Sequence, residues 1–342
     1  MTSRTLTRSL SVALFATMLL AQSLSQRAAG EILIVDRLQN SVYAYTDTGH
    51  YINTVLTDNT NLNLPDGILV SPDHTKLYVA SGGNSEIVRY DYDYATATAT
   101  NPTVFATSAD GLAFPNSMVF SPDGSKIYVA NLGGSSDTPV GISQLNVSGG
   151  SAGANFGGGS SFSFSGLAYA PGGQLLAGGF EGGTVGKSDA GITSISDFIG
   201  PSAALSGVAG VMVNGNDLYV SALLNPAGLV QKFDATTGAL DPSFNVSGLA
   251  APQGIMLAPD GNGLLVGSLG FSAGTGVISR IGFDGTLLGV FASPQTDPSL
   301  GFTEATAFGA VPEPSTQALA GIALAAVGFL ARRRRTSQSV GV

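Results

Sequence analysis

Short apolar runs separated by turn residues recur along the middle of the chain, and the spacing typical of amphipathic helices is absent there. One unit reads PDGILVSPD at residues 65–73 and KLYVA at residues 76–80. The next unit repeats this order at residues 115–124 and 126–130. Because Pro fixes φ and Asp hydrogen-bonds nearby backbone groups, Ser-Pro-Asp is typical of a tight turn between strands. The pattern therefore predicts a succession of short β-strands.

Six copies of this unit can be aligned by one position at the start of each apolar run, although the later copies are weaker. The aligned residues are Asp66, Asn116, Ser165, Ala209, Gln253 and Glu304. Their spacings are 50, 49, 44, 44 and 51 residues, and a small residue follows each of them. Four strands in a repeat of this length match one blade of a β-propeller, so we predict an all-β, six-bladed propeller of four-stranded blades. A β-helix would need a shorter repeat, and a two-sheet sandwich would not explain the equal spacing.

The two ends of the repeat region predict how the ring closes. Residues 31–36 match the second strand of a blade, whereas the first strand is missing at this end and present near the C-terminus. Residues 302–309 are therefore expected to complete the first blade, which removes an exposed sheet edge. The Tyr-Val-Ala and Ser-Pro-Asp-Gly signatures resemble those of NHL, YVTN and gluconolactonase-type propellers. This resemblance covers about residues 31–309 and holds at the level of the superfamily.

The N-terminus has the three-part order of a secretory signal peptide. Arg4 and Arg8 precede an apolar run of 12 residues at 10–21, which is too short to span a bilayer. Small residues at 28–30 follow and suit cleavage. The alternative is a buried helix of the fold.

The C-terminus combines a Pro-Glu-Pro motif, an apolar stretch and a basic cluster. The motif is Pro312, Glu313 and Pro314, and the cluster is Arg332, Arg333, Arg334 and Arg335. Residues 315–331 between them carry no charge, and as a helix they would reach about 26 Å, enough for the hydrocarbon of a bilayer. Consecutive Arg residues resist translocation, so the long N-terminal part is expected outside the membrane.

This order resembles the PEP-CTERM sorting signal of Gram-negative bacteria. The resemblance implies recognition by an exosortase-type enzyme, removal of the tail, and delivery to the cell surface or an exopolysaccharide matrix after transient anchoring by the C-terminal helix. A plain single-span anchor is the alternative. We expect four regions: a signal peptide over 1–29, the propeller over 30–310, the sorting signal over 311–336 and a tail over 337–342.

Composition excludes several kinds of chemistry. The chain has no Cys, which excludes disulfides, Cys-ligated zinc and thiol catalysis. Residues 31–311 carry 7 Lys and Arg against 22 Asp and Glu, a net charge of −15. Such an acidic body repels phosphate backbones, so we expect no nucleic-acid partner.

The best candidate site comes from the six aligned positions, which begin the innermost strands and are expected to surround one mouth of the ring. Oxygen-bearing side chains suit hard cations such as Ca²⁺. Resemblance to gluconolactonase-like propellers implies a divalent cation held by Glu, Asn and Asp, which matches the residue types of Glu304, Asn116 and Asp66 but not their order along the chain. The predicted Ca²⁺ site comprises Asp66, Asn116, Gln253 and Glu304. The alternative is that these residues cap strand ends and bind water.

Catalytic motifs are weak. The two His residues, His50 and His74, fall in predicted turns, which gives little support to a Ser-His-Asp triad. The sequence therefore favours an exported, non-enzymatic propeller that binds exopolysaccharide or a surface protein. Two alternatives stay open: a Ca²⁺-dependent, lactonase-like hydrolase with its site at the mouth, and a purely structural protein of the exopolysaccharide matrix.

Overall fold

In the computed structural model, short β-strands follow one another along almost all of the described residues. The described residues are 31–133, 141–157, 163–269 and 276–293, together with the backbone of 305–310. Three 3-10 turns interrupt the strands: η1 (Gly82–Asn84), η2 (Ser108–Asp110) and η3 (Ala203–Leu205). No helix in this part of the chain is long and apolar enough to cross a membrane. The signal helix and C-terminal helix expected from the sequence lie outside the described residues.

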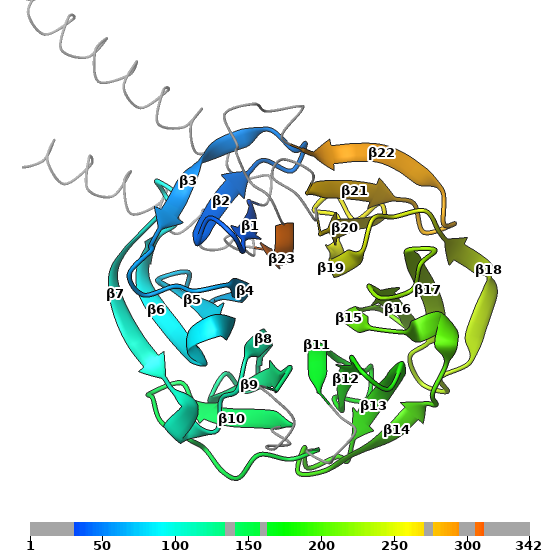
Figure 1. Cartoon of the computed structure of the whole chain (residues 1–342), viewed down its shortest axis with the longest axis horizontal. Helices are drawn as coiled ribbons and strands as arrows, with labels where there is room; N and C mark the ends of the chain where they lie inside the picture. Colours follow the sequence, from blue (N-terminus) through cyan, green and yellow to red (C-terminus); the bar gives the residue numbers. More distant parts are fainter. Residues whose placement is uncertain (1–30, 134–140, 158–162, 270–275, 294–304, 311–342) are drawn as a thin grey trace, which may run out of the picture. The chain divides into compact units, whose positions relative to one another are not determined.

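Six antiparallel sheets surround a common centre as the blades of a propeller (Figure 1), so the predicted fold class is confirmed. From centre to rim, the first blade contains β23 (Ala305–Ala310), β1 (Ile32–Asp36), β2 (Ser41–Tyr45) and β3 (Tyr51–Thr57). The second contains β4 (Pro65–Val70), β5 (Lys76–Ser81), β6 (Glu86–Asp93) and β7 (Thr98–Ala106). The third contains β8 (Pro115–Phe120), β9 (Lys126–Asn131) and β10 (Ile142–Asn146).

The remaining blades follow the same order. The fourth contains β11 (Phe164–Tyr169), β12 (Leu175–Gly179), β13 (Thr184–Ser188) and β14 (Ile195–Ile199). The fifth contains β15 (Val208–Asn214), β16 (Asp217–Ala222), β17 (Leu229–Asp234) and β18 (Leu240–Val246). The sixth contains β19 (Pro252–Leu257), β20 (Leu264–Ser268), β21 (Val277–Ile281) and β22 (Leu287–Ala292).

The ring is closed by the C-terminal strand, as the sequence predicts. Strand β23 pairs antiparallel with β1, and the register sets Ile34 opposite Phe308 and Ile32 opposite Ala310. The strand covers residues 305–310, and residues 302–304 of the predicted strand lie outside the described part. The first blade thus joins the two ends of the propeller, and its inner strand comes from the end of the repeat region.

The third blade departs from the four-stranded plan within the described residues. A segment rich in Gly occupies the place of its outer strand and makes two isolated bridges to β10, Ile142 with Phe156 and Leu145 with Ser151. Gly149 and Gly150 have φ values of +108° and +79°. These two residues form the turn that follows β10. Between the two bridges, the Gln144 side-chain amide donates to the carbonyl of Ala154 at 3.2 Å, so a side chain takes the place of a regular backbone ladder there.

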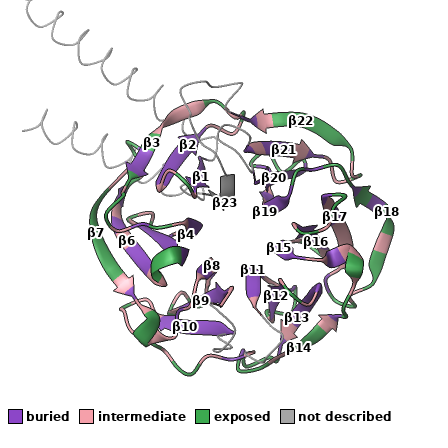
Figure 2. Ribbon diagram, in the orientation of Figure 1, coloured by how far each residue is buried: buried purple, intermediate pink, exposed green. Residues whose placement is uncertain are grey.

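Six apolar clusters fill the spaces between consecutive blades in the described part of the chain. Strand β1 shows how they form: Leu33 and Val35 pack toward the second blade, whereas Ile32 and Ile34 pack toward the sixth. Because both faces of the second strand of a blade are covered, such strands are near-continuous apolar runs. Burial is greatest on these second strands, and the rim strands β7, β18 and β22 are largely exposed (Figure 2).

Candidate functional site

The inner strands begin together at one end of the ring, which we call the site end. A Cβ atom built on Gly67 would lie 2.0 Å from the carbonyl oxygen of Asn116 in the next blade. One built on Gly210 would lie 2.3 Å from the carbonyl oxygen of Gln253. The small residue that follows each aligned position is therefore needed where the starts of neighbouring inner strands meet.

A β-bulge lies at the start of each fully described inner strand. Pairing with the second strand shifts between Pro65 and Ile68, Pro115 and Ser117, Phe164 and Leu167, Val208 and Gly210, and Pro252 and Ile255. The aligned residues of these five blades sit inside the bulges. Bulges re-aim a side chain out of the regular ladder and are frequent beside functional sites.

Two aligned positions offer nothing to a ligand. The Ser165 hydroxyl donates a short hydrogen bond to the carbonyl of Val208 in the next blade, and Ser165 is buried. Ala209 has no polar side-chain atom. The fourth blade therefore uses this position to bind the backbone of the next blade, and the fifth blade uses it for packing.

Asn116 and Gln253 keep unused hydrogen-bonding capacity. Gln253 is only 8% exposed, and its Oε1 has no hydrogen-bond partner among the described residues. Asn116 is half-buried, and its amide makes no hydrogen bond within the described part of the chain. Glu304 lies outside the described residues, so the Ca²⁺ site stays a prediction. The described ranges contain no group of three His, Asp or Glu side chains that could hold a metal ion.

Asp66 is paired with a cation from the preceding blade. Its carboxylate is 2% exposed, and its Oδ1 lies 3.8 Å from Nη1 of Arg37, which follows β1. The Arg37 side chain is 20% exposed, and its Cζ lies 5.3 Å from the centroid of the Phe114 ring. A guanidinium over an aromatic face is stabilised by the negative charge density of that face. Three successive blades therefore contribute Arg37, Asp66 and Phe114 to one cluster.

Phe114 is held firmly in this position. Its φ of +49° is in the left-handed region, which bulky side chains seldom adopt. The Phe114 N–H donates to Oγ of Ser85 at 3.2 Å, and its carbonyl accepts from the N–H of Leu132 at 3.0 Å. Gly82 leaves room for the ring, because a Cβ there would lie 2.8 Å from it. The backbone thus fixes the aromatic platform beneath Arg37.

Sequence reasoning missed Arg37 and Phe114. Neither belongs to the repeating signature, since Arg37 follows the strand end and Phe114 precedes Pro115. Because residues 31–311 contain only 7 Lys and Arg, a sequence search for basic residues that follow an inner-blade strand would have identified Arg37. The aromatic partner lies 77 residues later in sequence, and the packing of successive blades brings the two together.

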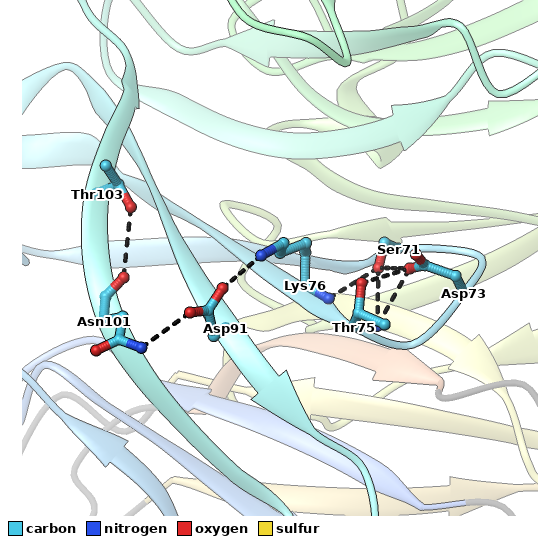
Figure 3. A network of polar contacts seen from close by, with 7 residues as sticks. All are labelled: Ser71, Asp73, Thr75, Lys76, Asp91, Asn101 and Thr103. Carbon is cyan, nitrogen blue, oxygen red and sulfur yellow. Dashed lines mark hydrogen bonds and ion pairs between the residues drawn. The ribbon is translucent and has the colours of Figure 1, made fainter.

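The opposite end of the ring, where hairpins join the first and second strands of each blade, carries a different kind of carboxylate. We call it the turn end. In the second blade, Oγ of Ser71 donates to Asp73 at 2.5 Å, and Asp73 also accepts from the N–H of Thr75 at 3.1 Å (Figure 3). These hydrogen bonds lower the pKa of Asp73. Its counterpart Asp123 accepts the same bonds, chiefly from Ser121, and they lower its pKa to about 2.

Neither His residue belongs to a catalytic arrangement among the described residues. His50 is exposed in the hairpin after β2. His74 is half-buried in the Ser71–Asp73 turn, with its ring 5.4 Å from the ring of Tyr94. Both lie at the turn end, away from the Arg37 cluster.

Two family models match parts of the chain. An SMP-30/Gluconolactonase/LRE-like region matches residues 28–136, which include β1 to β9. The PEP-CTERM protein-sorting motif matches residues 310–335, beginning at the last residue of β23. The chain is a six-bladed β-propeller protein with a PEP-CTERM sorting signal. This signal indicates export and sorting to the cell surface, with processing by an exosortase-type enzyme. No curated protein matches the chain in sequence.

Solved structures confirm the propeller fold at low sequence identity. A chain of a nidogen/laminin complex has a TM-score of 0.60 at 11% identity, covering 83% of this chain and 99% of its own. A putative 6-phosphogluconolactonase from Bacteroides fragilis has a TM-score of 0.57 at 15% identity, covering 83% and 98%. An inactive virginiamycin B lyase from Staphylococcus aureus with quinupristin has a TM-score of 0.54 at 13% identity, covering 77% and 85%.

Proposed function

We propose that this propeller is a non-enzymatic binding protein that is exported and delivered to the cell surface or an exopolysaccharide matrix. The apolar stretch at 315–331 anchors it transiently until an exosortase-type enzyme removes the tail. The site end of the ring then binds its partner, either exopolysaccharide or a surface protein. No nucleic acid is involved, because the acidic body repels phosphate.

The chemistry of the site end carries this proposal. Asn116 and Gln253 offer amide groups with unused hydrogen-bonding capacity, and Arg37 offers guanidinium donors above the Phe114 ring. Amides, a guanidinium and an aromatic face recognise hydroxyl and carbonyl groups without needing a reactive centre. The cluster has no nucleophile paired with a base among the described residues, so its groups suit binding better than bond cleavage.

Binding is tested by sedimentation of the full chain with purified exopolysaccharide of the producing organism. The double variant Asn116→Ala/Gln253→Ala should bind at least about tenfold more weakly, a loss of about 1.4 kcal/mol. Asn245→Ala is the matched control, because Asn245 is exposed on the rim strand β18. Equal binding by both variants and the wild type would contradict the role given to Asn116 and Gln253, and absence of binding by the wild type would favour a purely structural role in the matrix.

Sorting is tested by cell fractionation after replacing Arg332, Arg333, Arg334 and Arg335 with Ser. Loss of the basic cluster should abolish surface delivery and leave the tail attached, which mass spectrometry of the C-terminal peptide detects. Arg280→Ser controls for a change of charge on the propeller itself. Unchanged delivery of the first variant would contradict the role given to the basic cluster.

A Ca²⁺-dependent, lactonase-like activity is the second candidate. The SMP-30/Gluconolactonase/LRE-like match, which includes Asp66 and Asn116, favours it, as does structural similarity to the putative 6-phosphogluconolactonase. In this case Glu304, Asn116 and Asp66 would hold the cation. Hydrolysis of a sugar lactone that requires Ca²⁺ and disappears in Glu304→Ala would support the enzyme. Absence of hydrolysis in the wild type with Ca²⁺ would reject it.

A further inference from the structure

We infer that Arg37 is the resident cation of the site end and keeps divalent metal ions away from Asp66. The inference concerns the free protein and does not depend on which partner it binds. It also separates this chain from the metal-holding mouth that its resemblance to gluconolactonase-like propellers implies.

The charge of Asp66 is already balanced. A buried carboxylate is strongly unfavourable unless a cation or several donors accompany it. Asp66 is 2% exposed, and the Arg37 guanidinium stands 3.8 Å from its Oδ1. The two groups come from consecutive blades, so the packing of one blade against the next brings the cation to the carboxylate.

Two contacts stabilise the side-chain conformation of Arg37. Its guanidinium lies over the Phe114 ring, and the ring is fixed by the left-handed backbone of Phe114 and its bond to Ser85. Gly82 packs so closely that a single added carbon would meet the ring. A side chain held between an aromatic face and a carboxylate would lose both contacts on leaving.

A divalent ion on Asp66 would therefore meet a positive charge. Ca²⁺ binds carboxylate oxygen at about 2.4 Å, so it would stand within about 6 Å of the Arg37 guanidinium. Two cations at that distance in a partly buried site repel each other strongly, because little water screens them. The metal can bind only if the guanidinium leaves or if the metal gives up Asp66.

The other aligned positions do not compensate for this repulsion. Ca²⁺ prefers six to eight oxygen ligands. Ser165 is engaged with Val208, and Ala209 has no ligand atom. Asn116 and Gln253 contribute one neutral oxygen each. With Arg37 in place, the described side chains of the site end therefore do not fit a divalent metal.

The test is Ca²⁺ titration calorimetry on the full chain purified in detergent, with thermal unfolding in Ca²⁺ and in chelator as a second measurement. The wild type should bind Ca²⁺ no more tightly than about 1 mM, a value typical of weak sites. Arg37→Gln should bind it at least about tenfold more tightly, and Arg37→Gln/Asp66→Asn should return to wild-type weakness. Because only CaCl₂ is used, failure to find the biological partner would not affect the outcome.

Matched variants make the result specific. Arg280→Gln removes the same charge from the exposed pair with Asp260 at the turn end and should leave Ca²⁺ affinity unchanged. Phe114→Leu keeps every charge but removes the aromatic ring beneath Arg37. It should therefore raise Ca²⁺ affinity, by a smaller factor than Arg37→Gln does. It also replaces Arg37→Gln as the test if that variant does not fold. Micromolar Ca²⁺ binding by the wild type that Asp66→Asn abolishes would overturn the inference. Unchanged weak binding in both Arg37→Gln and Phe114→Leu would overturn it as well.

Discussion

The two ends of the ring hold their carboxylates in opposite ways. At the site end, Asp66 is buried and pairs with Arg37 from the preceding blade, 29 residues earlier in sequence. At the turn end, Asp73 and Asp123 are exposed and accept hydrogen bonds from residues two positions away. The first arrangement needs two consecutive blades packed together, whereas the second forms within a single hairpin.

This difference separates carboxylates that bind only within their own turn from the polar groups that the proposed binding function uses. The turn carboxylates use their oxygens on adjacent hydroxyl and N–H groups, which fixes the hairpin and leaves little for a ligand. At the site end, the Gln253 oxygen has no partner among the described residues, and the half-buried guanidinium of Arg37 faces an aromatic ring. The carboxylates of the turn end are thus hydrogen-bonded within single hairpins, whereas the carboxylate of the site end pairs with a residue of another blade.

The largest effect should come from adding one carbon where the inner strands meet. Gly67→Ala places a Cβ against the carbonyl of Asn116, and backbone at that distance cannot yield as a side chain would. We expect a loss of about 3 kcal/mol in the free energy of unfolding, measured by urea denaturation. Gly172→Ala is the control at the turn end, where the nearest atom is a flexible Gln174 oxygen 3.4 Å away. Similar losses in both variants would contradict the close approach of neighbouring strands.

Removing one carboxylate from each end should give unequal losses. Asp66→Ala leaves the half-buried guanidinium of Arg37 without its partner and should cost about 2 kcal/mol, since breaking a buried pair is costly and partial exposure reduces the effect. Asp73→Ala removes hydrogen bonds from an exposed turn and should cost about 0.5 kcal/mol. Urea denaturation at pH 7 measures both. If Asp73→Ala lowered the free energy of unfolding more than Asp66→Ala, the claim that the buried pair between blades stabilises the fold more than the exposed turn bonds would be wrong.

The sequence predicts the features that repeat, because a repeated environment leaves a repeated residue pattern. The Ser-Pro-Asp turns and apolar runs indicate the blade, their spacing indicates six blades, and residues 31–36 indicate closure by the C-terminal strand. The small residue after each aligned position is explained in the same way, since Gly67 and Gly210 meet the same backbone group of the next blade.

Features that belong to one blade are not predictable in this way. The third blade lacks a regular outer strand within the described residues, because its outer segment pairs with β10 only at two isolated bridges and the Gln144 side chain binds the backbone between them. Arg37 and Phe114 come from different blades, so neither local propensity nor the repeat spacing predicts their contact. The sequence therefore identifies Asp66 as a candidate residue but not the cation beside it, and this neighbour decides what Asp66 can bind.

Acid should destabilise the propeller mainly through the turn end. Hydrogen bonds from neighbouring hydroxyl and N–H groups lower the pKa of Asp123 and Asp241, each to about 2, with a Lys232 contact contributing most at Asp241. An unfolded Asp has a pKa of about 3.9, so these groups stabilise the fold above that pH and lose the effect as pH falls toward 2. The urea midpoint should fall steadily from pH 5 to pH 2.5. Asp123→Asn should make this fall shallower, and a midpoint independent of pH would contradict the assignment.

The smallest effect is expected for the ion pair of Lys76 and Asp91, which is the most visible contact in the network of Figure 3. Their side chains are 37% and 47% exposed, so water and salt screen the attraction. Lys76→Ala should change the melting temperature by only about 1 °C, and 0.5 M NaCl should remove even this difference. Thr103→Ala, on the same network, is the control for loss of a side chain from this surface. If Lys76→Ala lowered the melting temperature as much as Asp66→Ala does, an exposed and screened ion pair would stabilise the fold as much as the buried pair. Exposure would then not distinguish the two ends of the ring.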